Sequence, residues 1–163
     1  MPTNVTPKRK PNRASKLEFA VQYGVRSLQL PSQREFRKWA RAALASNTRV
    51  TPNTRITLRV IGAREARALN RRYRKRDYAT NVLTFVYPAA RRLEGDIAIC
   101  APVVTREART NGISRQAHYA HLTVHAILHL QGHDHQRARD AERMERLEAR
   151  ILAQLGHADP YRR

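Results

Sequence analysis

The most constraining feature of this 163-residue chain is a cluster of histidines near its carboxyl end. Five of the seven histidines lie between His121 and His135. His125 and His129 are four residues apart, so on a helix their imidazoles leave the same face about 6 Å apart along the axis. Gly132 follows as a residue that readily ends a helix in the left-handed conformation. The segment therefore predicts a helix that ends near Gly132, after which the chain turns and presents a further histidine beside the first two.

Two imidazoles from one helical turn and a third from the turn that follows predict an open three-histidine zinc site. The fourth coordination position is left for water or substrate, which is the pattern of catalytic rather than structural zinc. Spacing alone leaves both His133 and His135 as candidates for the third ligand. The site is not that of a zincin protease, which has a glutamate base where this chain has Ala126. Cys100 is the only cysteine, so a disulfide within the chain and a cysteine-rich zinc finger are excluded.

The alternative interpretation is a stripe of buried, hydrogen-bonded core histidines. Four histidines fall within an arc of roughly 80° on a helix, namely His118, His121, His125 and His129. Packing readily explains one histidine on an apolar face. It explains four of them poorly when two more follow the helix, because every buried ring nitrogen needs a partner. The pattern therefore favours a metal site.

The second strong feature is charge, since 32 Lys and Arg against 13 Asp and Glu give a net charge of +19. Such an excess predicts a polyanionic partner, most commonly nucleic acid. An anionic membrane is the weaker alternative, because the basic segments lack a broad apolar face. A run of basic residues without an acid predicts a surface that contacts phosphates: Arg67, Arg71, Arg72, Arg74, Lys75 and Arg76. No RNP-type aromatic motif is present, so sequence-specific base reading is not supported.

The length and the hydrophobic content of 41% favour one globular domain. We expect this domain over residues 16–156, between a disordered basic tail at 1–15 and a C-terminal tail at 157–163. No apolar run approaches the length of a membrane span, and no apolar segment of a secretory signal follows the basic start. A single thiol fits a reducing compartment. These features indicate a cytoplasmic protein without a membrane partner, and we expect a monomer.

Strand-like and helix-like periods alternate along the chain. Apolar alternation or compact apolar runs predict four strands, over residues 16–23, 53–61, 82–87 and 95–100. Helical spacing predicts a helix that opens at Pro31-Ser32 and another over 63–74 that buries Tyr73. The histidine helix is expected to start near Pro102 or near Ser114, and Gly156 ends a last helix. The fold class is therefore predicted as α/β (α+β), a single domain in which a mixed four-stranded sheet packs with about four to five helices.

Several segments resemble the YbeY-type endoribonucleases, bacterial proteins with relatives in organelles. The spacing His125-x3-His129-x5-His135 resembles the family's metal motif. Four further blocks, which precede the histidines in the chain, resemble the family's other blocks and stand in the same order: Ile56-Thr-Leu-Arg59-Val, Leu69-Asn70-x2-Tyr73-Arg74-x2-Asp77, Thr80-Asn81-Val82-Leu83-Thr84-Phe85 and Gly95-Asp96-Ile97. The resemblance covers roughly residues 16–156. It departs from the family at Ala126, Gln131 and His133, where glycine, an apolar residue and often tyrosine are usual.

The resemblance implies one Zn²⁺ per chain held by His125, His129 and His135, which selects His135 over His133. It implies cleavage of single-stranded RNA, with roles in ribosomal RNA maturation and ribosome quality control, and hence ribosomal RNA and the small ribosomal subunit as partners. It also implies that Arg59 faces the metal cleft as a catalytic residue. There its guanidinium would stabilise charge on the transition state of phosphodiester hydrolysis.

Two residues beside the histidines are predicted to orient a ligand through its second ring nitrogen: His121 and Asp134. No Asp or Glu is clearly placed as a general base, so zinc-activated water is expected to act without one. One rival function is a non-catalytic, zinc-stabilised assembly factor that binds ribosomal RNA, which the open coordination position disfavours. The other is a zinc hydrolase of a different substrate, peptides included, which the missing glutamate and the net charge of +19 disfavour.

Overall fold

The computed structural model describes residues 16–27, 29–46, 53–89, 91–133 and 135–162. The predicted tail at 1–15 and the candidate residue Asp134 lie outside these ranges. The described elements, in chain order, are β1 (Leu17–Tyr23), α1 (Gln33–Ala45), β2 (Asn53–Ile61), α2 (Ala63–Arg74), β3 (Val82–Tyr87), β4 (Arg92–Cys100), α3 (Ala101–Asn111), α4 (Arg115–Leu130) and α5 (Ala138–Gln154). The predicted α/β class, with a mixed four-stranded sheet and about four to five helices, is confirmed.

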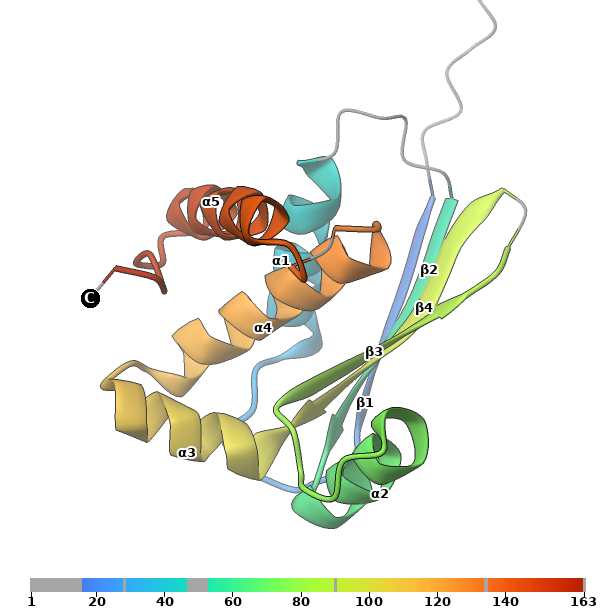
Figure 1. Cartoon of the computed structure of the whole chain (residues 1–163), viewed down its shortest axis with the longest axis vertical. Coiled ribbons are helices and arrows are strands. Elements are labelled where there is room, and N and C mark those ends of the chain that lie inside the picture. Colours follow the sequence, from blue (N-terminus) through green and yellow to red (C-terminus); the bar gives the residue numbers. More distant parts are fainter. Residues whose placement is uncertain (1–15, 28, 47–52, 90, 134, 163) are drawn as a thin grey trace, which may run out of the picture.

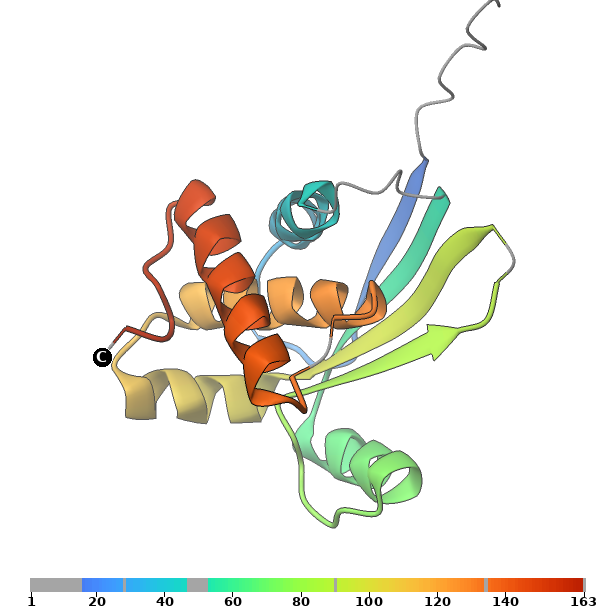
Figure 2. The same ribbon diagram turned by 45° about the horizontal axis from the view of Figure 1, so that its top comes forward.

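The sheet has the strand order β1-β2-β4-β3 (Figure 2). Strands β1, β2 and β4 run parallel to one another, and β3 pairs antiparallel with β4 as an edge strand. The alternation of buried and more exposed residues along β2 has a simple cause. Its side chains alternate between the two faces of the sheet, and Ile56, Leu58 and Val60 are apolar on one of them.

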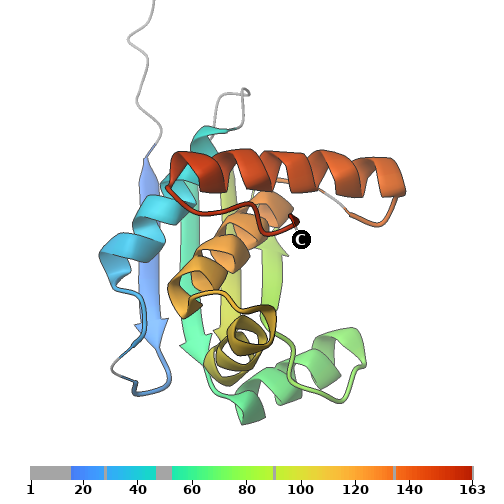
Figure 3. The same ribbon diagram turned by 90° about the vertical axis from the view of Figure 1, so that its left-hand side faces the viewer.

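The two faces of the sheet are covered by different helices. Leu58 and Val60 point into the larger core, which they share with residues of α1, α4 and α5. Ile61 and Ala98 point to the opposite face, where they pack with Ala66 of α2 in a smaller cluster. Figures 1 and 3 show α1, α4 and α5 on one side of the sheet, with α5 crossing outside α4, and α2 apart from them. Which face a side chain occupies therefore decides which helices it can meet.

Helix boundaries follow from local capping. Ser32 caps α1 with a reciprocal pair of hydrogen bonds, because its hydroxyl accepts from the Glu35 amide and its own amide donates to the Glu35 carboxylate. Gly112, with φ of 63°, ends α3, and the Ser114 side chain caps α4. The two alternative starts predicted for the histidine helix thus correspond to two separate helices.

Two local predictions need correction. The fourth strand begins at Arg92 rather than at Gly95, because its first residues pair with β2 (Asn53 beside Arg92) and complete the hairpin with β3. The prediction that Tyr73 is buried is wrong, since 54% of this residue is exposed. It lies in the last turn of α2, where its ring meets the edge of Phe85 at a centroid distance of 5.0 Å. Among the described residues no helix is long and apolar enough to cross a membrane.

Candidate metal centre

Helix α4 positions two of the three predicted ligands. Its opposite side consists of residues such as Val124, Ile127 and Leu128, which are fully buried in the larger core. Burial of that side fixes the rotation of the helix about its axis, so His125 and His129 emerge one turn apart on its partly exposed side. Their ring centroids are 4.6 Å apart.

The end of α4 brings in the third histidine. Gly132 has a φ of 93°, its amide donates to the His129 carbonyl at 3.0 Å, and the next amide, of His133, donates to the Leu128 carbonyl at 3.0 Å. This is the hydrogen-bond pattern of a left-handed helix stop, which reverses the chain direction. After the reversal the ring of His135 lies 4.7 Å from that of His129 and 5.8 Å from that of His125, measured between centroids.

The structure therefore brings together the three residues that were predicted to hold zinc. Each offers one ring nitrogen, and these nitrogens lie within 4.8 Å of one another. His133, which spacing alone had left open, is not a member of this group. Three imidazoles at this mutual distance form a donor set suited to zinc, with Zn–N distances of about 2.0–2.1 Å. The residues present thus fit the ion that the sequence predicts.

A pocket of about 380 Å³ opens in front of the histidines. Its wall consists of the three histidines, the segment 80–84 at the start of edge strand β3, and Arg74 from the end of α2. Among the described residues that line it there is no carboxylate and one guanidinium. The lining supplies metal ligands and one positive charge, which suits an anionic substrate.

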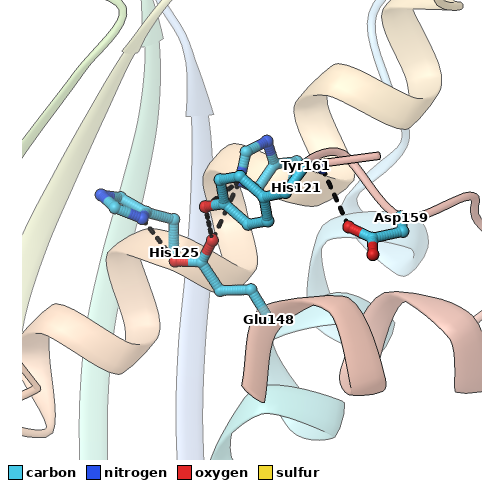
Figure 4. Close-up of polar contacts among 5 residues, drawn as sticks. All are labelled: His121, His125, Glu148, Asp159 and Tyr161. Carbon is cyan, nitrogen blue, oxygen red and sulfur yellow. Dashed lines mark hydrogen bonds and ion pairs between the residues drawn. The ribbon is translucent and has the colours of Figure 1, made fainter. Parts of the chain in front are cut away.

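Behind the histidines lies a buried carboxylate that the sequence analysis did not identify. Glu148 of α5 has no exposed surface, and its Oε1 accepts a hydrogen bond from Nδ1 of His125 at 2.5 Å (Figure 4). The protonated Nδ1 leaves Nε2 of His125 for a metal, and a carboxylate in this place fixes both the tautomer and the ring orientation. Its other oxygen, Oε2, accepts from Nε2 of His121 at 3.0 Å and from the hydroxyl of Tyr161.

The charge of Glu148 is maintained by these donors. Burial raises the pKa of the carboxyl, but hydrogen bonds from His121, His125 and Tyr161 together outweigh burial and bring the pKa to about 2. Glu148 is therefore an anion at neutral pH. His121, which was predicted to orient a ligand, contacts Glu148, which in turn contacts His125.

His121, His125 and Glu148 form a second group whose ligand atoms lie within 4.8 Å of one another. Hydrogen bonding explains this group better than a metal does. Two ligands of one tetrahedral zinc, each about 2.0–2.2 Å from the ion, lie roughly 3.3 Å apart. The 2.5 Å between Nδ1 of His125 and Oε1 of Glu148 is too short for that and is a normal charge-assisted hydrogen bond. The group of His125, His129 and His135 is therefore the better candidate for a metal site.

The structure does not place Arg59, which was predicted to face the metal cleft, at the histidine pocket. Arg59 does alternate with Leu58 and Val60, as expected, but these two residues point toward α4 and Arg59 consequently points away from it. Its Nη1 donates to Oε1 of Glu65 in the first turn of α2 at 2.6 Å, and it is absent from the residues that line the histidine pocket. Strand alternation fixes the face of a residue, and here α4 packs on the other face.

The six predicted RNA-binding residues all lie on or just after α2, and all are exposed. They are not equivalent. Arg67 forms a paired ion bridge with Asp77, with nitrogen–oxygen distances of 2.8 and 2.9 Å, and this hydrogen bonding raises the pKa of the guanidinium. Arg74 lines the histidine pocket, as described above. The structure thus separates a locally neutralised arginine from one that reaches the candidate metal centre.

The remaining basic residues surround exposed tyrosines. The guanidinium of Arg72 lies 5.3 Å from the centroid of the Tyr73 ring, and Nη1 of Arg76 donates to the Tyr78 hydroxyl at 3.4 Å. Tyr73 and Tyr78 are 54% and 50% exposed. These two tyrosines do not form an RNP-type motif in the sequence. We call Tyr73, Tyr78 and the basic residues of 71–76 the α2 surface.

A larger pocket of about 550 Å³ lies at the other end of the sheet, near the start of β1 and β2. Both acidic residues of its lining form ion pairs there, Glu18 with Lys16 and Arg55, and Glu94 with Arg92. The pocket contains no histidine or cysteine. Its size alone does not make it a catalytic site, and the chemistry of the histidine pocket is the more informative criterion.

The sequence around Glu148 did contain a signal that this carboxylate is buried. It stands on the same helical face as Met144, Ile151 and Leu152, which are all buried. A carboxylate in the middle of an apolar helical stripe must find hydrogen-bond donors, because an isolated buried charge is very costly. That spacing alone predicts a buried network, although it does not tell which residues complete it.

Comparison with known proteins is consistent with this geometry. The sequence pattern of a family described as Endoribonuclease YbeY matches residues 22–156. A protein named Endoribonuclease YbeY from Methylobacillus flagellatus is 50% identical over 146 residues, covering 90% of this chain and 94% of its own length. One of the same name from Nitrosomonas europaea is 45% identical over 161 residues, covering 99% and 94%. The solution structure of TM1509 from Thermotoga maritima superposes with a TM-score of 0.54 at 18% identity, covering 89% of this chain and 99% of that one, and supports the fold alone.

Proposed function

Because this chain belongs to the endoribonuclease YbeY family, whose members are RNA-cleaving hydrolases, we propose a specific activity for it. It cuts single-stranded RNA with one zinc ion bound by His125, His129 and His135. The main support is the geometry of three ring nitrogens within 4.8 Å of one another in an open pocket. An open pocket is typical of catalytic zinc, whereas structural zinc is enclosed by four protein ligands.

When bound, the ion would supply Lewis-acid chemistry, polarising a phosphoryl oxygen and making a water molecule more acidic. The protein contributes orientation and charge. Glu148 holds the ring of His125 so that one nitrogen faces the pocket. Arg74 stands at the pocket wall, and its planar guanidinium can pair with two oxygens of a phosphate. We therefore propose Arg74 as the arginine that contacts the scissile phosphate.

The α2 surface is proposed to hold the RNA strand next to the pocket. Its arginines and Lys75 would contact phosphates, and the rings of Tyr73 and Tyr78 are exposed enough to stack on unpaired bases. Stacking requires bases that are not already paired, which is consistent with a single-stranded substrate. Arg67 lies outside this surface and is expected to contribute little to RNA binding, because Asp77 already neutralises it.

We further propose ribosomal RNA and the small ribosomal subunit as the physiological substrate and partner, and the cytoplasm as the compartment. The net charge of +19 supports a large polyanionic partner. Cys100 is buried and free, and burial raises the pKa of its thiol. A non-catalytic assembly factor that binds RNA with the same basic surface is the alternative, and the open pocket disfavours it.

A cleavage assay distinguishes the two functions. Purified protein is added to a labelled single-stranded RNA and to the same RNA annealed to its complement, with chelator and after zinc is restored. We expect cleavage of the single strand that chelator abolishes and zinc restores, and no cleavage by His129→Ala. Tight RNA binding without cleavage in zinc would instead support the assembly factor.

A further inference from the structure

The residues after α5 fold back onto the candidate metal centre. Gly156, with φ of 83°, ends the helix, and the ring of His157 then packs edge-on against Trp39 at a centroid distance of 6.2 Å. Four residues further on, the amide of Tyr161 donates to Oδ1 of Asp159 at 2.9 Å (Figure 4). These contacts fix the direction in which the Tyr161 side chain points. The C-terminal tail predicted at 157–163 is thus ordered against the domain through residue 162.

Tyr161 points its hydroxyl at the buried carboxylate described above. The hydroxyl donates to Oε2 of Glu148 and lies 3.1 Å from Nε2 of His121. The two rings, of Tyr161 and His121, meet edge to face at 5.5 Å with an interplanar angle of 85°. Burial and the hydrogen bond to Glu148 raise the pKa of the phenol, so it remains a proton donor at neutral pH.

Three donors therefore share the two oxygens of one fully buried carboxylate. A buried anion without enough hydrogen-bond donors has a high free-energy cost, so its side chain shifts toward other donors. If Oε2 lost the Tyr161 hydroxyl, the carboxylate would be held on that side by His121 alone. Its other oxygen, which orients His125, would then be less firmly placed.

We propose that Tyr161 is a positioning residue of the metal centre, acting through Glu148 on His125, and that the segment after α5 belongs to this site. The inference rests on the proposed zinc site. It goes beyond the proposed function, which assigns no role to Tyr161, a residue outside the stretch 22–156 that the family pattern matches. A merely structural tyrosine would stabilise the fold without influencing the metal.

The test compares two tyrosine-to-phenylalanine changes that each remove one hydroxyl. Tyr161→Phe should weaken zinc binding about 3- to 10-fold in competition with a chelator, less than the 10- to 100-fold typical of a residue that contacts the ligand directly. Tyr23→Phe is the matched control. Tyr23 lies at the end of β1, and its hydroxyl donates to the Pro31 carbonyl at 2.6 Å. Its zinc affinity should equal that of the wild type, and the visible spectrum of bound Co²⁺ should change only in Tyr161→Phe.

A double-mutant cycle separates the positioning role from general stability. In the Glu148→Gln background, Tyr161→Phe should lose most of its effect on zinc affinity, because the path to His125 is already broken. Fully additive losses, or an unchanged zinc affinity in Tyr161→Phe, would overturn the role proposed for Tyr161 while leaving the zinc site intact. A wild-type protein that binds no zinc would overturn both.

Discussion

The two faces of the sheet use charge in opposite ways. On the α4 face a single carboxylate, Glu148, is fully buried and surrounded by three donors. On the α2 face the side chains of Arg59 and Glu65 form an ion pair at about 40% exposure each. Exposed pairs contribute about 0–1 kcal/mol, whereas leaving a buried charge without its partner costs about 3–5 kcal/mol. The buried carboxylate therefore orients the residues around it, whereas the exposed pair contributes little to stability.

The largest expected effect tests which of two arginines on the α2 side acts in cleavage: Arg74 at the histidine pocket, or Arg59 paired with Glu65. Arg74→Ala should reduce turnover by roughly 10²–10³ with zinc content unchanged, the loss typical of one preorganised charge-stabilising donor. Arg59→Ala should reduce turnover far less, because its guanidinium contacts Glu65 and does not line the histidine pocket. Single-turnover rates of the two variants check this. A greater loss in Arg59→Ala, with zinc and fold retained, would restore the catalytic role that the sequence predicted for Arg59.

The next effect concerns the buried carboxylate. Glu148→Gln should weaken zinc binding by about 10–100-fold, because the orientation of His125 depends on the charged acceptor. RNA affinity measured without metal should remain unchanged, since Glu148 is fully buried behind the pocket. Chelator competition and a filter-binding titration measure the two quantities on one protein preparation. Equal losses of zinc and RNA affinity would indicate that the two faces are not independent.

The exposed face should respond to salt. Changing Arg71, Arg72 and Lys75 together to Ala should weaken binding of all RNA sequences alike and flatten the slope of log affinity against log salt by about 2, at about 0.7 per phosphate contact. Arg67→Ala serves as the control, because Asp77 already neutralises that arginine and little change is expected. If the slope is unaffected by the triple change, the RNA is bound elsewhere on the protein.

The smallest effect concerns a residue next to the metal centre. Both polar side-chain atoms of Gln131, the C-cap of α4, are buried without a partner among the described residues. Replacing an unsatisfied buried amide with an apolar side chain of similar size removes a desolvation cost of about 1–3 kcal/mol. Gln131→Leu should therefore raise the free energy of unfolding in urea. Decreased stability would show that the amide has a partner in the native protein.

Much of this fold was accessible from the sequence, for physical reasons. The bounds of β2, α2 and β3 agree with the predicted ranges 53–61, 63–74 and 82–87, because apolar periodicity and turn residues are local signals. The pairing of His125 with His129 also depends on local geometry, namely one helical turn, and the left-handed stop at Gly132 brings a third histidine near. Spacing left His133 and His135 both open for that place, and the family resemblance selected His135.

The rest depended on tertiary packing. Alternation showed that Arg59 and Leu58 lie on opposite faces, but nothing in the strand indicated which face α4 would cover. Glu148 follows His125 by 23 residues and comes from another helix, and Tyr161 reaches it only after the chain reverses at Gly156. Such contacts require the relative placement of whole elements, which periodicity within one element does not specify.

The central claim is that His125, His129 and His135 together hold the catalytic zinc, and a matched pair of variants tests it most directly. His135→Ala removes a ligand, and His133→Ala removes a histidine two residues away that is not in the group. Elemental analysis of the purified proteins should find about one zinc per chain in the wild type and in His133→Ala, and little in His135→Ala. Full zinc in His135→Ala, or its loss in His133→Ala alone, would contradict this account.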